Sequence, residues 1–72
     1  MIDELASVAL VRDLPEHGLK AGDVGTVVLL HGDRGYEVEF MTLSGETIAV
    51  VTLITQDVRP VGEREVAHAR PL

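Results

Sequence analysis

The sequence has no cysteine, only two aromatic residues and no long apolar run. Without cysteine, neither a disulfide nor a thiolate metal site can stabilise the fold, and a reducing cytoplasm is the predicted location. A membrane-spanning helix needs about 20 consecutive apolar residues, and a secretory signal begins with basic residues where this chain has acids. We therefore expect a cytoplasmic protein with no membrane contact.

Basic side chains are scarce, with 6 against 12 acidic ones, and the formal net charge is -6. Such a field repels phosphate backbones and attracts basic partners. The basic residues are scattered, and neither Tyr36 nor Phe40 lies beside a basic stripe on which bases could stack. The charge therefore disfavours nucleic-acid binding and favours a basic protein partner.

The sequence also lacks a catalytic motif. His17, His31 and His68 have no nucleophile paired with them, and neither of the two serines lies in a nucleophile elbow. The glycine-bearing stretch 18–25 has neither phosphate-loop spacing nor a helix after it. We predict a protein that is not an enzyme and that has no cofactor.

Residues 13–27 contain four potential metal ligands, which are Asp13, Glu16, His17 and Asp23. Oxygen and imidazole donors of this kind bind divalent ions. Acidic residues beside glycine are also ordinary turn chemistry, in which a carboxylate accepts hydrogen bonds from nearby backbone N–H groups. We favour this turn role, above all for Asp23, and predict no metal site.

The same stretch predicts a shaped loop between two strands. Pro15 fixes its own φ and keeps the residue before it out of the helical region, so the chain leaves the first strand here. Gly18 and Gly22 supply the backbone freedom that brings the chain back. Gly25, inside the next strand, marks a bulge, a bend or a close backbone approach. We assign these residues a structural role.

Short segments rich in β-branched residues predict strands over residues 5–11, 24–31, 36–40, 47–54 and 59–61. Strict alternation over 36–40 directs the two aromatic side chains to one face and two glutamates to the other. Glycine-bearing connections at 31–35 and 42–46 predict hairpins, and residues 55–58 predict a 3₁₀ turn. The predicted core consists of Val8, Leu10, Val27, Tyr36, Val38 and Phe40.

These elements predict an all-β fold, a small five-stranded, partly open SH3-like barrel with a long first loop and a 3₁₀ turn before the last strand. The barrel occupies residues 1–61 as one domain. From Gly62 the chain has helix formers but few apolar side chains, and Pro71 would end any helix. We predict that residues 62–72 are a C-terminal tail that is flexible or ordered by a partner.

Hydrophobic residues reach 46% of the chain, more than the inside of one small barrel requires. The second and fourth strands are apolar on both faces, so one face of each is predicted to form a protein–protein contact. In the alternative, residues 13–23 with Ile2 and Leu5 cover this face within one chain. We favour a homodimer, including a version with an exchanged strand. The predicted interface consists of Val28, Leu30, Ala49, Val51 and Leu53.

Three segments carry a family resemblance, namely Asp57-Val58-Arg59-Pro60, Tyr36-Glu37-Val38-Glu39-Phe40 and Asp13-Leu14-Pro15-Glu16-His17-Gly18-Leu19-Lys20-Ala21-Gly22-Asp23-Val24-Gly25-Thr26-Val27-Val28. Over residues 5–61 the chain resembles a family of short bacterial proteins catalogued only as a domain of unknown function. The resemblance implies an SH3-like barrel and assigns no catalytic residue. Some members are encoded beside toxin-like partners.

A more distant resemblance, over residues 20–27, is to the KOW-type barrels of ribosomal proteins and transcription factors. It implies RNA binding, but the basic residues that contact RNA in those barrels are largely absent here. We therefore predict a non-enzymatic protein-interaction module that self-associates and binds a basic protein, in a toxin-neutralising or regulatory role. A KOW-like RNA-binding module is the alternative.

Overall fold

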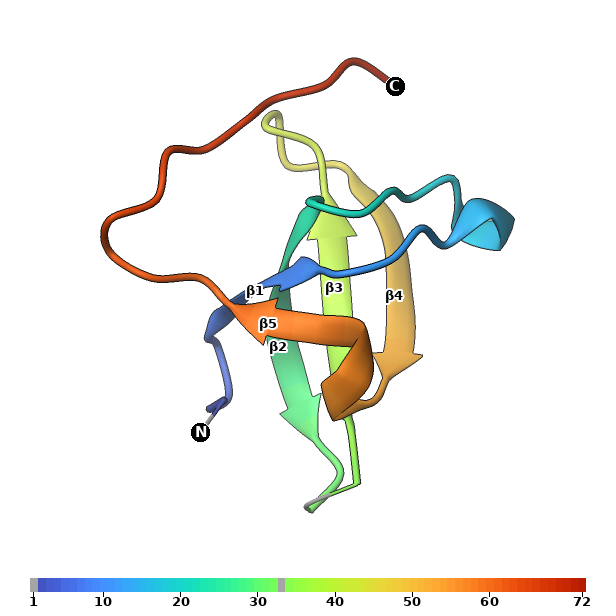
Figure 1. The fold of residues 1–72 in the computed structure, drawn as a ribbon. Helices are drawn as coiled ribbons and strands as arrows, with labels where there is room; N and C mark the ends of the chain where they lie inside the picture. The colour runs from blue at the N-terminus through green and yellow to red at the C-terminus, as the bar shows by residue number, and fades with distance from the viewer. Residues whose placement is uncertain (1, 33) are drawn as a thin grey trace.

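The computed structural model describes residues 2–32 and 34–72, which form five strands and two 3₁₀ turns (Figure 1). Within these residues, no helix is both long and apolar enough to cross a membrane. The elements in chain order are β1 (Ser7–Leu10), η1 (Pro15–His17), β2 (Val24–Leu30), β3 (Tyr36–Met41), β4 (Thr47–Leu53), η2 (Thr55–Asp57) and β5 (Val58–Pro60).

The strands form one antiparallel sheet in the order β4-β3-β2-β1-β5. Figure 1 shows β1 and β5 running across the other three strands, so the sheet bends over and encloses the core between its two parts. β4 and β5 remain as edges, and over the described residues the sheet does not close into a barrel. The predicted all-β, partly open fold with a 3₁₀ turn before its last strand is therefore confirmed.

β3 is the middle of the larger part of the sheet, and its alternating sequence sets the two faces. Val38 and Phe40 are buried, while Glu37 and Glu39, which alternate with them, point away from the core. Glu37 lies opposite Leu29 of β2 and Thr52 of β4. We call the side that carries the glutamates the outer face.

The structure buries most of the predicted core residues, and Tyr36 is partly buried against them. Two buried leucines that the sequence analysis did not assign come from the first loop. Leu14 and Leu19 flank η1 and pair with each other through their backbones, so both side chains enter the core together. The first loop therefore covers part of the core within one chain, while Leu5, which the alternative also assigned to this cover, is 75% exposed.

β4 directs its apolar residues differently from the prediction. Val51 and Leu53, assigned to the interface, are buried in the core, and Ala49 packs against it. The reason is register. Val51 lies opposite Val38, and directly opposed residues in a sheet share a face, so Val51 must follow Val38 inward. The exposed apolar side chain of this strand is Val50 instead.

The remaining predicted interface residues, Val28 and Leu30, are exposed. Both lie in the last part of β2, where the pairing with β3 shifts register between Val27 and Leu29. A bulge of this kind changes the direction of the side chains that follow it. The sequence does not reveal the bulge at this position, because residues 27–30 are all apolar and show no alternation.

The loop glycines have the backbone shapes that the sequence predicted. Gly18 and Gly22 have φ values of 69° and 92°, in the left-handed region that glycine adopts without strain. Pro15 begins η1. Gly25 marks a close approach rather than the bulge, since an added Cβ would lie 2.6 Å from Val38 Cγ1 and 2.8 Å from Phe40 Cε1.

Gly25→Ala is expected to destabilise the fold, because the new methyl group would displace two core side chains. Overpacking of a close-packed core typically costs about 1–3 kcal/mol. Urea unfolding followed by circular dichroism measures this cost. Gly62→Ala is the matched control, because its Cβ would meet only the Glu65 side-chain end at 3.4 Å. Equal stability of the two variants would contradict the close approach.

Candidate functional site

A hollow lies between the C-terminal tail and the end of the sheet where β3 joins β4. Its volume is about 570 Å³, and we call it the tail groove. Figure 1 shows the tail leaving β5 and arching over this end of the sheet. The tail contributes Ala67, His68, Ala69, Arg70 and Leu72 to one wall. The opposite wall is mainly apolar and consists of Leu19, Val24, Phe40, Met41, Leu43 and Ile48, with Asp23, Thr42 and Ser44.

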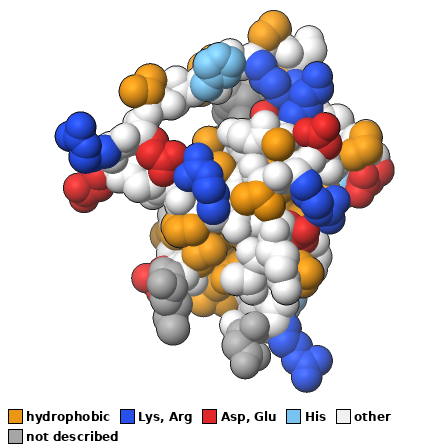
Figure 2. Space-filling model, in the orientation of Figure 1, with side chains coloured by type: hydrophobic (Ala, Val, Ile, Leu, Met, Phe, Trp, Pro, Cys, Tyr) orange, Lys and Arg blue, Asp and Glu red, His pale blue; other side chains and the backbone are white. Residues whose placement is uncertain are grey.

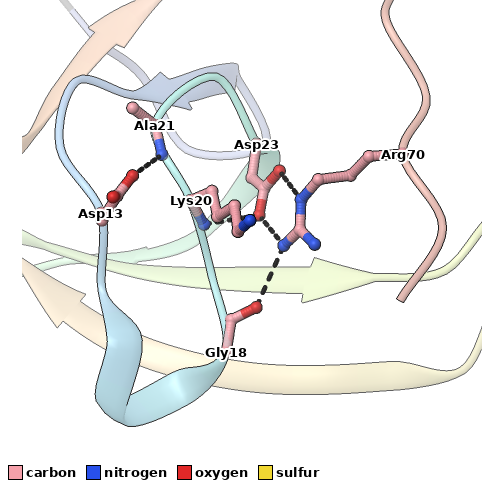
Figure 3. Close-up of polar contacts among 6 residues, drawn as sticks. All are labelled: Asp13, Gly18, Lys20, Ala21, Asp23 and Arg70. Atoms are coloured by element: carbon pink, nitrogen blue, oxygen red, sulfur yellow. Dashed lines mark hydrogen bonds and ion pairs between the residues drawn. The ribbon is translucent and has the colours of Figure 1, made fainter.

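Arg70 fixes the tail over the tail groove (Figure 3). Its Nε donates to Asp23 Oδ1 at 2.8 Å, and its Nη2 donates to Asp23 Oδ2 at 2.6 Å and to the Gly18 carbonyl at 3.0 Å. The side chains of Arg70 and Asp23 are only 27% and 17% exposed. A bidentate arginine–carboxylate contact of this kind is stronger and more directional than an ion pair with one hydrogen bond.

The first loop holds the Asp23 carboxylate through its own backbone. Asp23 Oδ2 accepts a hydrogen bond from the Lys20 N–H at 2.9 Å, and Asp13 Oδ1 accepts one from the Ala21 N–H at 2.8 Å (Figure 3). The predicted turn role of Asp23 is confirmed. The described residues contain no group of three or more histidine, aspartate or glutamate side chains placed to hold a metal ion.

The ion pair changes the titration of both partners. The hydrogen bond from Arg70 lowers the pKa of Asp23, partial burial opposes this shift, and the Lys20 N–H lowers the pKa further. The pKa of Arg70 is raised, first by its hydrogen bond to Asp23. Both groups are therefore charged at neutral pH.

A second polar cluster lies on the outer face. Glu37 Oε2 accepts a hydrogen bond from Thr52 Oγ1 at 2.5 Å and lies 2.7 Å from His31 Nε2. Glu39 accepts one from Thr47 Oγ1 at 2.6 Å. The hydrogen bond from Thr52, followed by the contact with His31, lowers the pKa of Glu37. The outer face thus carries negative charge at neutral pH.

The histidines considered as acids or bases lie in separate places. His31 contacts Glu37 on the outer face, His68 lines the tail groove, and His17 is exposed in η1. The sequence analysis did not identify Arg70 as a residue of the candidate site. Its partner Asp23 is 47 residues away in the chain, so no local sequence pattern links the two. The sequence analysis noted only that the basic residues are scattered, which does not single out Arg70.

The sequence model of a protein family described as a domain of unknown function (DUF4926) matches residues 4–60. The chain belongs to this family. The searches found no curated protein and no solved structure that matches the chain. The DUF4926 match includes Gly18 and Asp23 and ends before Arg70. The acceptor groups of the ion pair therefore belong to the family domain, and the arginine comes from outside it.

Arg70→Ala is expected to raise the pKa of Asp23 toward its ordinary value of 3.8. Because the folded-state pKa is lowered, the pair stabilises the protein fully above about pH 4, and this contribution is lost as the pH falls through the lowered pKa. Carboxyl carbon chemical shifts followed by NMR measure the titration. Arg64→Ala removes the same charge from the tail and should leave the pKa of Asp23 unchanged.

Proposed function

We propose that this chain is a non-enzymatic protein-interaction module that forms a homodimer through the edge strand β4. The observation that carries the proposal is the chemistry of that edge. Among the described strands β4 pairs with β3 alone, and its seven residues include no charged residue and no proline. A free strand of this kind offers unpaired N–H and C=O groups to a second chain.

The opposite edge of the sheet is protected. β5 has only three residues, and they include Arg59 and Pro60. Short length, a charge and a proline are the devices by which proteins prevent edge-to-edge pairing. Since one edge is blocked and the other is open, β4 is the edge that supports pairing with a second copy.

Exposed apolar side chains next to the open edge support the same contact. Val50 is 53% exposed on the outer face of β4, and Ile54 is exposed just after the strand. Leu29 is exposed on β2, two strands away. Antiparallel pairing of two β4 strands about a two-fold axis would extend the sheet and bury part of this surface. Exchange of β4 between the two chains is a variant of the same dimer.

A basic protein is the second partner in this proposal. The net charge of -6 and the glutamates of the outer face would steer it, in a toxin-neutralising or regulatory role. We place the protein in the cytoplasm because it has no cysteine. RNA binding has less support, because on the face that Figure 2 shows basic side chains are interspersed with acidic ones.

Val50→Lys is expected to convert the dimer to a monomer, because a charge on the open edge opposes strand pairing. Val11→Lys is the matched control, since Val11 is similarly exposed, at 48%, but lies outside the strands, after β1. Light scattering at micromolar concentration measures the mass. A monomeric wild-type protein, or a dimer that persists in Val50→Lys, would contradict the proposed contact.

A further inference from the structure

We propose that the Asp23 carboxylate and the Gly18 carbonyl form a binding site for an arginine-bearing, extended segment of a partner protein. In the absence of the partner, the tail occupies this site with its own Arg70. The inference rests on the proposed interaction role and names the chemistry that the partner presents. It uses a different surface from the β4 edge.

The first loop holds both acceptor groups, the Asp23 carboxylate and the Gly18 carbonyl, in position through contacts that do not involve the tail. Leu14 and Leu19 are buried in the core, which anchors the loop on both sides of Gly18. The Lys20 N–H orients the Asp23 carboxylate. A carboxylate and a carbonyl held at fixed positions match the planar fork of a guanidinium better than the single ammonium of lysine.

The charge around the site also favours a cation. The hydrogen bond to Asp23 raises the pKa of Arg70 most, and the charge of Asp13 raises it further. The chain as a whole carries a net charge of -6. A basic partner is therefore attracted to this surface before contact and finds a specific acceptor on it.

The tail fills the tail groove poorly. Its side chains beside Arg70 that face the groove include two alanines, while its larger apolar side chains, Val66 and Leu72, remain 96% and 76% exposed. On the opposite wall, Met41 and Leu43 are also exposed. A segment with larger apolar residues on both sides of its arginine would bury more of this wall, so it would displace the tail.

The tail is also held at few points. Glu65 accepts hydrogen bonds from Arg59 and the Gly62 N–H at its beginning. Among the described residues, the tail residues 66–69 make no hydrogen bond. The tail can therefore leave the tail groove once the contact of Arg70 is replaced, without disturbing the sheet.

The test uses the protein of residues 1–72 and a fluorescent synthetic peptide with the sequence of residues 66–72. Wild-type protein should bind the peptide weakly, because its own tail competes at an effective concentration on the order of millimolar. Arg70→Ala should bind the peptide about tenfold more tightly, as measured by fluorescence anisotropy. Arg64→Ala is the charge-matched control and should behave as the wild type.

Two further measurements establish what the site recognises. Replacing the arginine of the peptide by lysine should weaken binding to Arg70→Ala protein. Adding Asp23→Asn to the Arg70→Ala protein should abolish binding, because asparagine keeps an acceptor for the Lys20 N–H but loses the charge. Equal binding of the peptide to wild-type and Arg70→Ala protein, or binding that survives Asp23→Asn, would overturn the proposal.

Light scattering of the same variants separates this proposal from the β4 dimer. Arg70→Ala should keep the mass of the wild type. A fall from dimer to monomer in Arg70→Ala would mean that the tail binds a second copy of the chain, which would overturn the assignment to a partner protein. A monomeric wild type that binds the peptide as expected would contradict the β4 dimer and support the arginine site.

Discussion

The structure depends on the close approach of β2 to β3 at Gly25. Two core side chains of β3, Val38 and Phe40, occupy the space that any larger residue at this position would fill. Because they pack directly on the backbone of β2, the sheet can bend and carry β1 and β5 across the other strands (Figure 1). That bend encloses the core and leaves β4 at an open edge.

The first loop completes the core and at the same time builds the candidate site. Burying a leucine side chain contributes roughly 1.5–3 kcal/mol, and both Leu14 and Leu19 are buried. An ion pair near the surface typically contributes only about 0–1 kcal/mol. Leucine burial therefore determines where the loop lies. The ion pair of Asp23 and Arg70 joins the tail to a loop whose position the two leucines already determine.

The ion pair of Asp57 and Arg12 contributes to the stability of the fold. Asp57, at the end of η2, is nearly buried and accepts hydrogen bonds from Arg12 Nε at 2.8 Å and from the Ile54 N–H at 3.1 Å. Burial alone would raise the pKa of Asp57, but these two donors outweigh it and the pKa is lowered. This pair joins the end of β1 to the turn before β5, whereas Arg70 joins the tail to the loop.

The sequence by itself determined the five strands, the turn role of the loop glycines and the inward face of β3, because each rests on a local pattern. Period-two alternation identified Val38 and Phe40, and glycine spacing identified the loop. Tertiary structure alone decided which face of β4 is buried, since both faces are apolar and only pairing with Val38 directs Val51 inward. It also decided the contact of Arg70 with Asp23, because no local pattern links residues so far apart in the chain.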